Sequence, residues 1–320
     1  MPPSNESSNN TVVITGGLGF VGRHLINELK TEEPDTPIIV WDRTTSPILS
    51  GVEAQAIDIT EPKSYQALLQ AAQPNWVIHL AGLAPVGASW KYPERVHRVN
   101  CEATRQLLEA IERVSPATKM LAVSSADIYG HGAPDPLLEL PLSDAHPHSP
   151  YAQSKWAMEK MIAASFNDRV IRVRPFPHIG PGQQRGFVVA DFCSQIAAIE
   201  IGKQPSGLRV GNLEAIRDFT DVRDVVRAYQ LLHQLGKMGE VYHVATGTGR
   251  SIRQVLDQLL SLSSSDITIE PDPSRLRPAD IPALIGDATK LKTATGWEPA
   301  IAFEETLRDT LTYWRGNLKN

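Results

Sequence analysis

Short apolar runs alternate with helical patterns along the first 175 residues of the chain. The runs are rich in valine and isoleucine, which is typical of buried parallel strands, and they cover residues 11–15, 37–42, 75–80, 119–125 and 169–174. After the first run, Val21, Leu25 and Leu29 recur at a spacing of four and share one helix face. This alternation predicts an α/β fold built on a doubly wound parallel sheet.

The second half of the chain has a different texture. Loops become richer in glycine and proline after residue 175, and the helical patterns shorten. The alternation nevertheless continues, with a strand predicted at 240–246, a helix at 251–262 and an amphipathic closing helix near 303–314. We therefore predict a smaller substrate lobe over 176–320, with segments that return to the sheet. Ligands of such sheets bind at the carboxyl ends of the strands.

A glycine-rich turn follows the first predicted strand. Residues 16–22 read Gly-Gly-Leu-Gly-Phe-Val-Gly and lead directly into the first helical pattern. Glycine permits a tight turn, and the bare backbone lets a pyrophosphate approach the amides at the helix N-terminus. The sequence predicts a Rossmann-type dinucleotide-binding domain over 11–175, after a disordered tail over 1–10. The expected cofactor contacts in this turn are Gly16, Gly19, Phe20, Val21 and Gly22.

The second predicted strand ends in Asp42 and Arg43. An acid about 20 residues after the glycines can accept hydrogen bonds from the adenosine ribose, which favours NAD. The Arg43 guanidinium can instead hold a 2′-phosphate, which favours NADP, so the choice between NAD and NADP stays open. Asp58 and Ile59 are expected to border the adenine. The alternatives are a solvated charge at Arg43 and an ordinary turn at Asp58.

Composition narrows the class of partner. The 320 residues carry 31 Lys and Arg against 36 Asp and Glu, a net charge of −5, so no basic surplus exists to neutralise nucleic-acid phosphates. Cys101 and Cys193 cannot form a disulfide scaffold, and they fit the reducing cytoplasm. No apolar run approaches about 18 residues, and no signal peptide is evident. We expect a cytoplasmic protein with a small-molecule substrate and no metal site.

A candidate catalytic group follows the fourth predicted strand. This strand ends at Ser125, and Tyr151 and Lys155 come later, one helical turn apart on one face. A phenol has a pKa of about 10, which an adjacent ammonium lowers by stabilising the phenolate. Lys155 can also hold the nicotinamide ribose, and Ser125 can orient a substrate carbonyl. These groups suit proton transfer to or from an alcohol oxygen while a hydride moves.

Four motifs together carry a family resemblance. They are Thr-Gly-Gly-Leu-Gly-Phe-Val-Gly at 15–22, His-Leu-Ala-Gly at 79–82, Ser-Ser-Ala-Asp-Ile-Tyr-Gly at 124–130, and Tyr-x-x-x-Lys at 151–155. The chain resembles an extended short-chain dehydrogenase/reductase of the NAD-dependent epimerase/dehydratase family. The resemblance implies a homodimer formed through a four-helix bundle, from the helices near 99–111 and 151–162. It also implies a catalytic trio of Ser125, Tyr151 and Lys155, and cofactor contacts at Leu80, Ala81 and Gly82.

The second half resembles the GDP-mannose branch of this family. The similar segments are 174–183, 210–220, 277–280, 284–287 and 295–297. The resemblance implies that Arg217 and Arg277 grip a nucleotide diphosphate, for which guanidinium forks are suited, and that Asp280 binds ribose hydroxyls. Structural ion pairs are the alternative for both arginines. The other substrate contacts expected from the resemblance are Ser125, Asp127, Pro177, His178 and Val188.

Two departures from the branch bear on the reaction. Pro177 stands where the branch usually has asparagine, so a side-chain hydrogen bond to the substrate is lost there. The dehydratases resemble one another in having Thr-Asp-Glu or Thr-Ser-Glu where this chain has Ser125, Ala126 and Asp127. Alanine can act as neither acid nor base, whereas a carbonyl reduction needs only the trio and a hydride.

The resulting prediction is an NAD(P)H-dependent reductase of the 4-keto group of a nucleotide sugar. GDP-4-keto-6-deoxy-D-mannose, reduced to GDP-D-rhamnose, is the expected substrate. A nucleotide-sugar 4-epimerase or 4,6-dehydratase with tightly held NAD(P) is the enzymatic alternative. A non-catalytic dinucleotide-sensing or scaffold protein is the alternative of another class.

Overall fold

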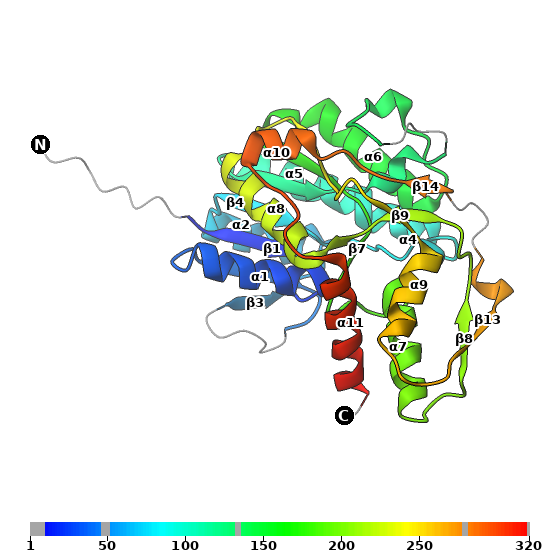
Figure 1. Cartoon of the computed structure of the whole chain (residues 1–320). Coiled ribbons are helices and arrows are strands. Elements are labelled where there is room, and N and C mark those ends of the chain that lie inside the picture. The colour runs from blue at the N-terminus through cyan, green and yellow to red at the C-terminus, as the bar shows by residue number, and fades with distance from the viewer. Residues whose placement is uncertain (1–9, 46–51, 132–135, 277–280, 319–320) are drawn as a thin grey trace, which may run out of the picture.

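The computed structural model describes residues 10–45, 52–131, 136–276 and 281–318. Most of the predicted tail over 1–10 lies outside these residues, as do Arg277 and Asp280. The fold is organised around a central parallel sheet, which lies beside a second lobe (Figure 1). None of the helices in the described ranges is long and apolar enough to cross a membrane.

The central sheet has seven strands in the order β11-β6-β5-β4-β1-β2-β3, and every neighbouring pair is parallel. The order reverses at β1, so the carboxyl ends of β1 and β4 flank the crevice in which doubly wound sheets bind ligands. The strands are β1 (Val12–Thr15), β2 (Ile38–Asp42), β3 (Glu53–Ala56), β4 (Trp76–His79), β5 (Lys119–Val123), β6 (Val170–Pro175) and β11 (Val241–Val244).

Helices cover both faces of this sheet. One face packs against α1 (Phe20–Glu32) and α8 (Val222–Leu235), and the other against α2 (Gln66–Ala72), α5 (Ala103–Val114) and α6 (Pro150–Ser165). The predicted α1 face is real, since Leu25 and Leu29 are fully buried. Each such side chain contributes about 1.5–3 kcal/mol through burial.

The doubly wound α/β prediction is confirmed. The five strands predicted in the first half agree with β1, β2, β4, β5 and β6 to within two residues, and the strand predicted at 240–246 is β11. The edge strand β3 was not predicted, because its sequence Glu-Ala-Gln-Ala has no β-branched residue and its side chains are partly or fully exposed.

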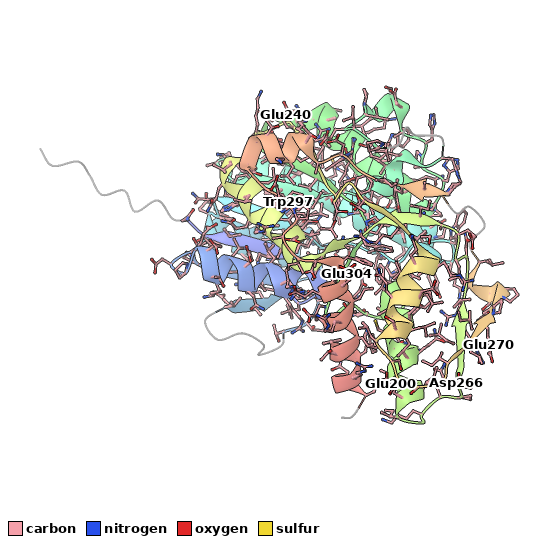
Figure 2. All side chains as sticks on the ribbon, in the orientation of Figure 1. Glu200, Glu240, Asp266, Glu270, Trp297 and Glu304 are labelled. Carbon is pink, nitrogen blue, oxygen red and sulfur yellow. The ribbon has the colours of Figure 1, made fainter. Side chains whose placement is uncertain are left out.

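The second lobe has its own apolar core, formed by α7 (Val188–Glu200), α9 (Ile252–Ser261) and α11 (Phe303–Asn317). In Figure 1, α7 and α9 lie between α11 and a small two-stranded sheet. Glu200, labelled in Figure 2, accepts hydrogen bonds of 2.7 and 2.6 Å from Arg315, which joins the end of α7 to α11. The small sheets contain β7 (His178–Ile179), β8 (Gly207–Val210), β9 (Ile216–Asp218), β10 (Thr220–Asp221), β12 (Gly249–Ser251), β13 (Thr268–Pro271) and β14 (Ala283–Leu284).

Connections complete the fold. Trp297, labelled in Figure 2, is buried and donates to the Asp224 carbonyl at 2.9 Å, which fastens the chain before α11 to α8. The remaining helices are α3 (Val86–Ser89), α4 (Pro93–His97) and α10 (Thr289–Thr295). A π-helical turn (Arg98–Glu102) lies between α4 and α5, and 3₁₀ turns occur at Pro62–Ser64, Ala126–Tyr129, Leu142–Asp144, Asn167–Arg169 and Pro273–Arg275.

Candidate functional site

The glycine-rich turn connects β1 to α1 at the carboxyl end of the sheet. Gly16 has φ of 70°, and a Cβ there would lie 2.9 Å from the backbone of Ala81. A Cβ at Gly22 would lie 2.5 Å from the Cα of Gly17, so the helix packs onto the turn without room for a side chain. Gly19, the N-cap residue of α1, has no side chain to accept from the first main-chain N–H groups of the helix. These N–H groups can therefore bind an anion such as a pyrophosphate.

Asp42 braces this turn from the end of β2. Its carboxylate accepts hydrogen bonds from the main-chain N–H of Leu18 at 3.0 Å and of Arg43 at 2.7 Å. Nearby, Asp58 accepts from the side chain and N–H of Thr60, and these bonds, with Arg98 and Arg43, lower the pKa of Asp58. Arg98 was not predicted at the site.

Ile59 and the segment 80–82 occupy two different environments. The Ile59 side chain is buried among apolar core residues, so only its backbone can border an adenine. The predicted segment 80–82 runs along the glycine turn, and the Ala81 N–H donates to Thr15 Oγ1 at 3.2 Å. A Cβ at Gly82 would lie 3.6 Å from Lys155 Nζ. This segment therefore links the glycine turn to the predicted catalytic lysine.

Two buried polar residues hold this segment and were not predicted as site residues. His79 contacts Thr15 Oγ1 at 2.7 Å and Thr104 Oγ1 at 2.9 Å, and burial, with the charge of Lys155, lowers its pKa to about 3. Asn100, in the π-helical turn, accepts from the Leu83 N–H at 2.8 Å and donates to Ser154 Oγ at 3.0 Å. A polar residue on the apolar face of a predicted helix was the available signal for Asn100.

Ser125, Tyr151 and Lys155 converge at the carboxyl end of β5. Ser125 caps the 3₁₀ turn that follows this strand, and its Oγ accepts from the Asp127 N–H at 3.2 Å. Tyr151 lies in the first turn of α6, where the Ser125 side chain is close enough to lower the pKa of its phenol. One turn later, Lys155 Nζ donates to the Val123 carbonyl at 2.7 Å. All three members of the trio are buried.

The pKa of Tyr151 differs from the sequence prediction. Burial raises it above the ordinary value of a phenol, the charge of Asp127 raises it further, and the Ser125 side chain lowers it. The prediction that Lys155 lowers this pKa is wrong for the chain by itself, because desolvation outweighs the other effects. Burial also lowers the pKa of Lys155 to about 8, against an upward effect of Glu159. At neutral pH the site therefore holds a protonated phenol beside an ammonium.

His178 and Pro177 lie where the two lobes meet. His178 Nδ1 donates to the Phe176 carbonyl at 3.1 Å, and its ring stacks on Phe20 of α1 with centroids 6.2 Å apart. Burial lowers the pKa of His178, which keeps the imidazole neutral. The Pro177 carbonyl accepts from the Thr220 N–H at 3.0 Å, so its backbone is engaged in the β7–β10 connection.

The other predicted substrate residues lie on the second lobe. Val188 begins α7 and packs on its core, while Arg217 is on β9 and donates to the Ile216 carbonyl at 2.7 Å. Next to it, buried Asp218 accepts hydrogen bonds from 246–247 and from Gly286. The predicted contacts Arg277 and Asp280 lie outside the described residues.

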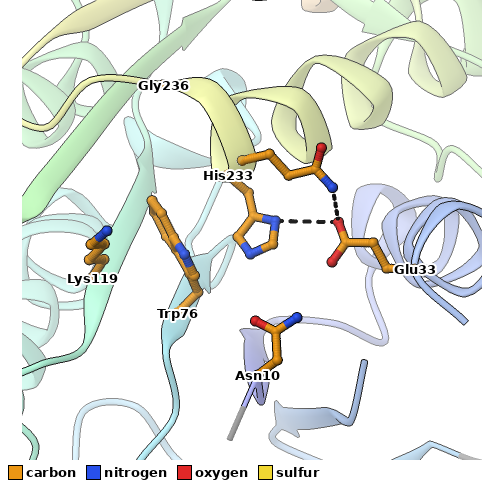
Figure 3. A pocket seen from close by; sticks show the side chains of 7 residues that line it. Asn10, Glu33, Trp76, Lys119, His233 and Gly236 are labelled. Atoms are coloured by element: carbon orange, nitrogen blue, oxygen red, sulfur yellow. Dashed lines mark hydrogen bonds and ion pairs between the residues drawn. The ribbon is translucent and has the colours of Figure 1, made fainter. Parts of the chain in front are cut away.

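A separate polar cavity lies at the amino ends of the strands. It has a volume of about 330 Å³ and contains none of the predicted site residues. Figure 3 shows Glu33 facing His233, and Glu33 Oε1 lies 3.5 Å from His233 Nδ1. Glu33 Oε1 also accepts a hydrogen bond of 2.9 Å from the Gln234 side chain. Among the described residues, no group of three or more His, Cys, Asp or Glu is placed to bind a metal ion.

Comparisons with known proteins agree with this arrangement. A family model described as GDP-mannose 4,6 dehydratase matches residues 13–310. GDP-6-deoxy-D-mannose reductase of Pseudomonas aeruginosa is 35% identical over 96% of this chain and 97% of its own length.

Two solved structures show the same likeness. RMD from Pseudomonas aeruginosa complexed with NADPH has 34% identity and a TM-score of 0.83, covering 96% of this chain and 99% of that one. UDP-glucose 4-epimerase from Thermus thermophilus, in complex with NAD, has 27% identity and a TM-score of 0.83 with the same coverage of 96% and 99%.

Proposed function

Since this chain belongs to the GDP-mannose 4,6-dehydratase family of extended short-chain dehydrogenases/reductases, we propose that it reduces the 4-keto group of GDP-4-keto-6-deoxy-D-mannose to give GDP-D-rhamnose. The observation that carries the proposal is the meeting of Ser125, Tyr151 and Lys155 beside the glycine turn, with alanine at position 126. This set can protonate a carbonyl oxygen but has no acid or base at 126 for the elimination of water.

Ser125, Tyr151 and Lys155 each have a separate role in the proposed reaction. When bound, the reduced nicotinamide supplies the hydride for C4. The Ser125 hydroxyl and the Tyr151 phenol donate hydrogen bonds to the 4-keto oxygen, which polarises the carbonyl. The raised pKa of Tyr151 keeps the phenol protonated, so it is ready to give its proton to the developing alkoxide. The Lys155 ammonium then stabilises the phenolate.

Cofactor choice depends on the end of β2. Both carboxylate oxygens of Asp42 already accept main-chain N–H groups, whereas the Arg43 side chain is exposed and, like Arg98, close enough to lower the pKa of Asp58. Two guanidinium groups in this place suit a 2′-phosphate. The proposed cofactor is therefore NADP(H), with NAD(H) as the alternative.

The proposed assembly is a homodimer through a four-helix bundle. The helices α5 and α6 lie on the same face of the sheet and both contribute to its core. On α6, Ala157 and Met161 pack against this core but stay partly exposed, so part of their apolar surface is left for a partner helix. Light scattering of the purified protein tests this assembly. A cytoplasmic location fits the two buried, unpaired cysteines.

A 4-epimerase or 4,6-dehydratase is the second candidate. The carboxylate of Asp127 lies near enough to Tyr151 to raise the pKa of that phenol, so one acid is present at the site. A dehydratase would convert GDP-mannose without added reductant and would purify with tightly held oxidised cofactor.

The deciding experiment mixes the purified protein with GDP-4-keto-6-deoxy-D-mannose and NADPH or NADH. We expect loss of the reduced-nicotinamide absorbance and formation of GDP-D-rhamnose. Tyr151→Phe should lower kcat about 10²- to 10⁴-fold, because it removes the proton donor. The matched control is Tyr92→Phe, which removes a hydroxyl from an exposed side chain. If neither cofactor is oxidised by the unaltered protein, the proposal is refuted.

A further inference from the structure

Four buried polar side chains form a connected hydrogen-bond network next to the catalytic trio. Glu159 (0% exposed) comes from α6, Arg174 (1%) from β6, Tyr129 (0%) from the 3₁₀ turn after Ser125, and His243 (0%) from β11. None of them touches the predicted position of substrate or cofactor in the proposed mechanism. Burying so many polar groups is costly unless each one is paired.

The pairing of Arg174 is extensive. Its Nε and Nη2 donate to the two carboxylate oxygens of Glu159 at 2.9 and 2.8 Å. Its Nη1 donates to Tyr129 Oη at 2.5 Å and to the Leu140 carbonyl at 2.9 Å. Burial opposes the charge on Arg174, but the bonds to Glu159 outweigh it and raise the pKa of the guanidinium. This bidentate geometry fixes the distance between α6 and β6.

The hydrogen bonds beyond Arg174 have one consistent direction. His243 Nδ1 lies 3.2 Å from the Asp287 carbonyl, which can only accept, so the imidazole hydrogen is on Nδ1. His243 Nε2 is then an acceptor, and Tyr129 Oη donates to it at 2.5 Å. Tyr129 in turn accepts from Arg174. Burial, with the charge of Arg174, lowers the pKa of His243 to about 3, so the imidazole stays neutral at physiological pH.

The hydrogen-bond network formed by these four side chains extends to three parts of the protein. Glu159 lies one helical turn after Lys155, and Tyr129 lies four residues after Ser125. At the other end, the Asp287 N–H donates to the Leu137 carbonyl at 2.8 Å, close to β14 of the second lobe. One connected set of bonds therefore spans the catalytic helix, the serine turn and the segment 283–287.

We propose that Arg174 is a positioning residue of the reaction, which through Glu159 and Tyr129 holds the Lys155 helix and the Ser125 turn at a fixed separation. Through Tyr129 and His243 it also ties both to the segment 283–287. Well-packed apolar side chains are often as stabilising as a buried ion pair, so the value of this one lies in the geometry that it specifies. The kinetic part of the proposal rests on the proposed function.

The test is Tyr129→Phe, which removes the hydroxyl that connects Arg174 to His243 in the hydrogen-bond network. Arg174 keeps its bonds to Glu159 and Leu140, so the buried charge stays paired. Tyr242→Phe is the matched control, since it removes a buried hydroxyl from the residue beside His243 that only accepts from the Lys237 N–H. The first readout is hydrogen–deuterium exchange of 123–129, 151–159 and 283–287, and the second is steady-state reduction of the ketosugar.

In Tyr129→Phe we expect faster exchange in all three segments and a kcat about 10- to 100-fold lower, because displacements of about 1 Å have effects of this size. The KM for the cofactor should change less than twofold, and Tyr242→Phe should leave kcat unchanged. Should Tyr129→Phe not fold, His243→Leu removes the nitrogen that accepts from the Tyr129 hydroxyl. It is expected to give the same changes in exchange and in kcat.

Glu159→Gln gives a reading that general destabilisation would not produce. The charge of Glu159 raises the pKa of Lys155, so its removal should move the alkaline limb of the pH–kcat profile to lower pH. Unchanged exchange in the three segments, or an equal response in Tyr242→Phe, would overturn the positioning role. Absence of ketosugar reduction by the unaltered protein would refute the proposed function alone, since the exchange experiment still decides the role of Arg174.

Discussion

Replacing Asp218 by asparagine tests how one buried carboxylate holds the second lobe together. Asp218 is fully buried, and its Oδ1 accepts from the Thr246 N–H at 3.0 Å and from the Thr246 hydroxyl at 2.5 Å. Its Oδ2 accepts from the Gly247 N–H at 2.8 Å and the Gly286 N–H at 3.3 Å. Every group that faces this side chain is therefore a donor.

The asparagine amide could not satisfy all four donors. With its NH₂ group toward Gly247 and Gly286 it would face two N–H donors, but toward Thr246 it would face only one, because the Thr246 hydroxyl can turn and accept. Each buried donor without an acceptor costs about 1–3 kcal/mol, so the free energy of unfolding would fall by about 1–3 kcal/mol in the better orientation. Burial raises the pKa of Asp218, because ionisation inside the protein is unfavourable, and a neutral amide avoids that penalty. We expect a net loss in the lower half of this range.

The measurement is the free energy of unfolding of Asp218→Asn from denaturant titration followed by tryptophan fluorescence. Asp257→Asn is the control, because Asp257 is exposed on α9. We also expect a raised KM for the GDP-sugar with little change for the cofactor, since Asp218 adjoins Arg217 on β9. A stability of Asp218→Asn within about 0.5 kcal/mol of the unaltered protein would refute the reasoning.

Three further predictions concern the proposed reaction. The rate of reduction should fall as pH rises through about 8, because the Lys155 ammonium is lost there; a pH–kcat profile that stays flat well above that pH contradicts this. Arg43→Ala should raise the KM for NADPH roughly tenfold while leaving the KM for NADH unchanged. Equal effects on both KM values would show that Arg43 does not bind the 2′-phosphate. Asn100→Ala should lower kcat about tenfold, because it removes the bonds that hold the segment 80–83 beside Lys155; activity equal to the unaltered protein would show that the backbone holds this segment unaided.

Local patterns were enough to predict much of the fold. Fully buried parallel strands need apolar side chains on both faces, so the interior strands of the sheet are visible in the sequence. The edge strand β3 was missed because its side chains are partly or fully exposed, and the strands of the small sheets were missed because each is only two to four residues long. Those strands form where distant segments meet, as β8 does with β13.

In the site, too, only the features that depend on a local sequence pattern could be predicted. Glycine spacing and the Tyr151–Lys155 pair are local, so both could be predicted from the sequence. The pKa of Tyr151 could not, since desolvation depends on everything packed around the phenol. Arg174 stood in an apolar strand, which hinted at a buried charge, but its partner Glu159 comes from another element and only the fold brings them together.

The π-helical turn between α4 and α5 has a consequence for how this chain can change in length. One residue more than a regular helix would hold is accommodated at Arg98–Glu102, and Asn100 stands in its middle. Removing a single residue there would restore ordinary winding and leave α4 and α5 in nearly the same rotational relation, because the widened turn absorbs the additional residue. A deletion within α5 itself would instead rotate the two ends of the helix by about 100° relative to each other. What the widened turn determines is the direction of Asn100 toward Leu83 and Ser154. A single-residue deletion in the turn should therefore leave the flanking helices in place and yet displace Asn100 from its partners.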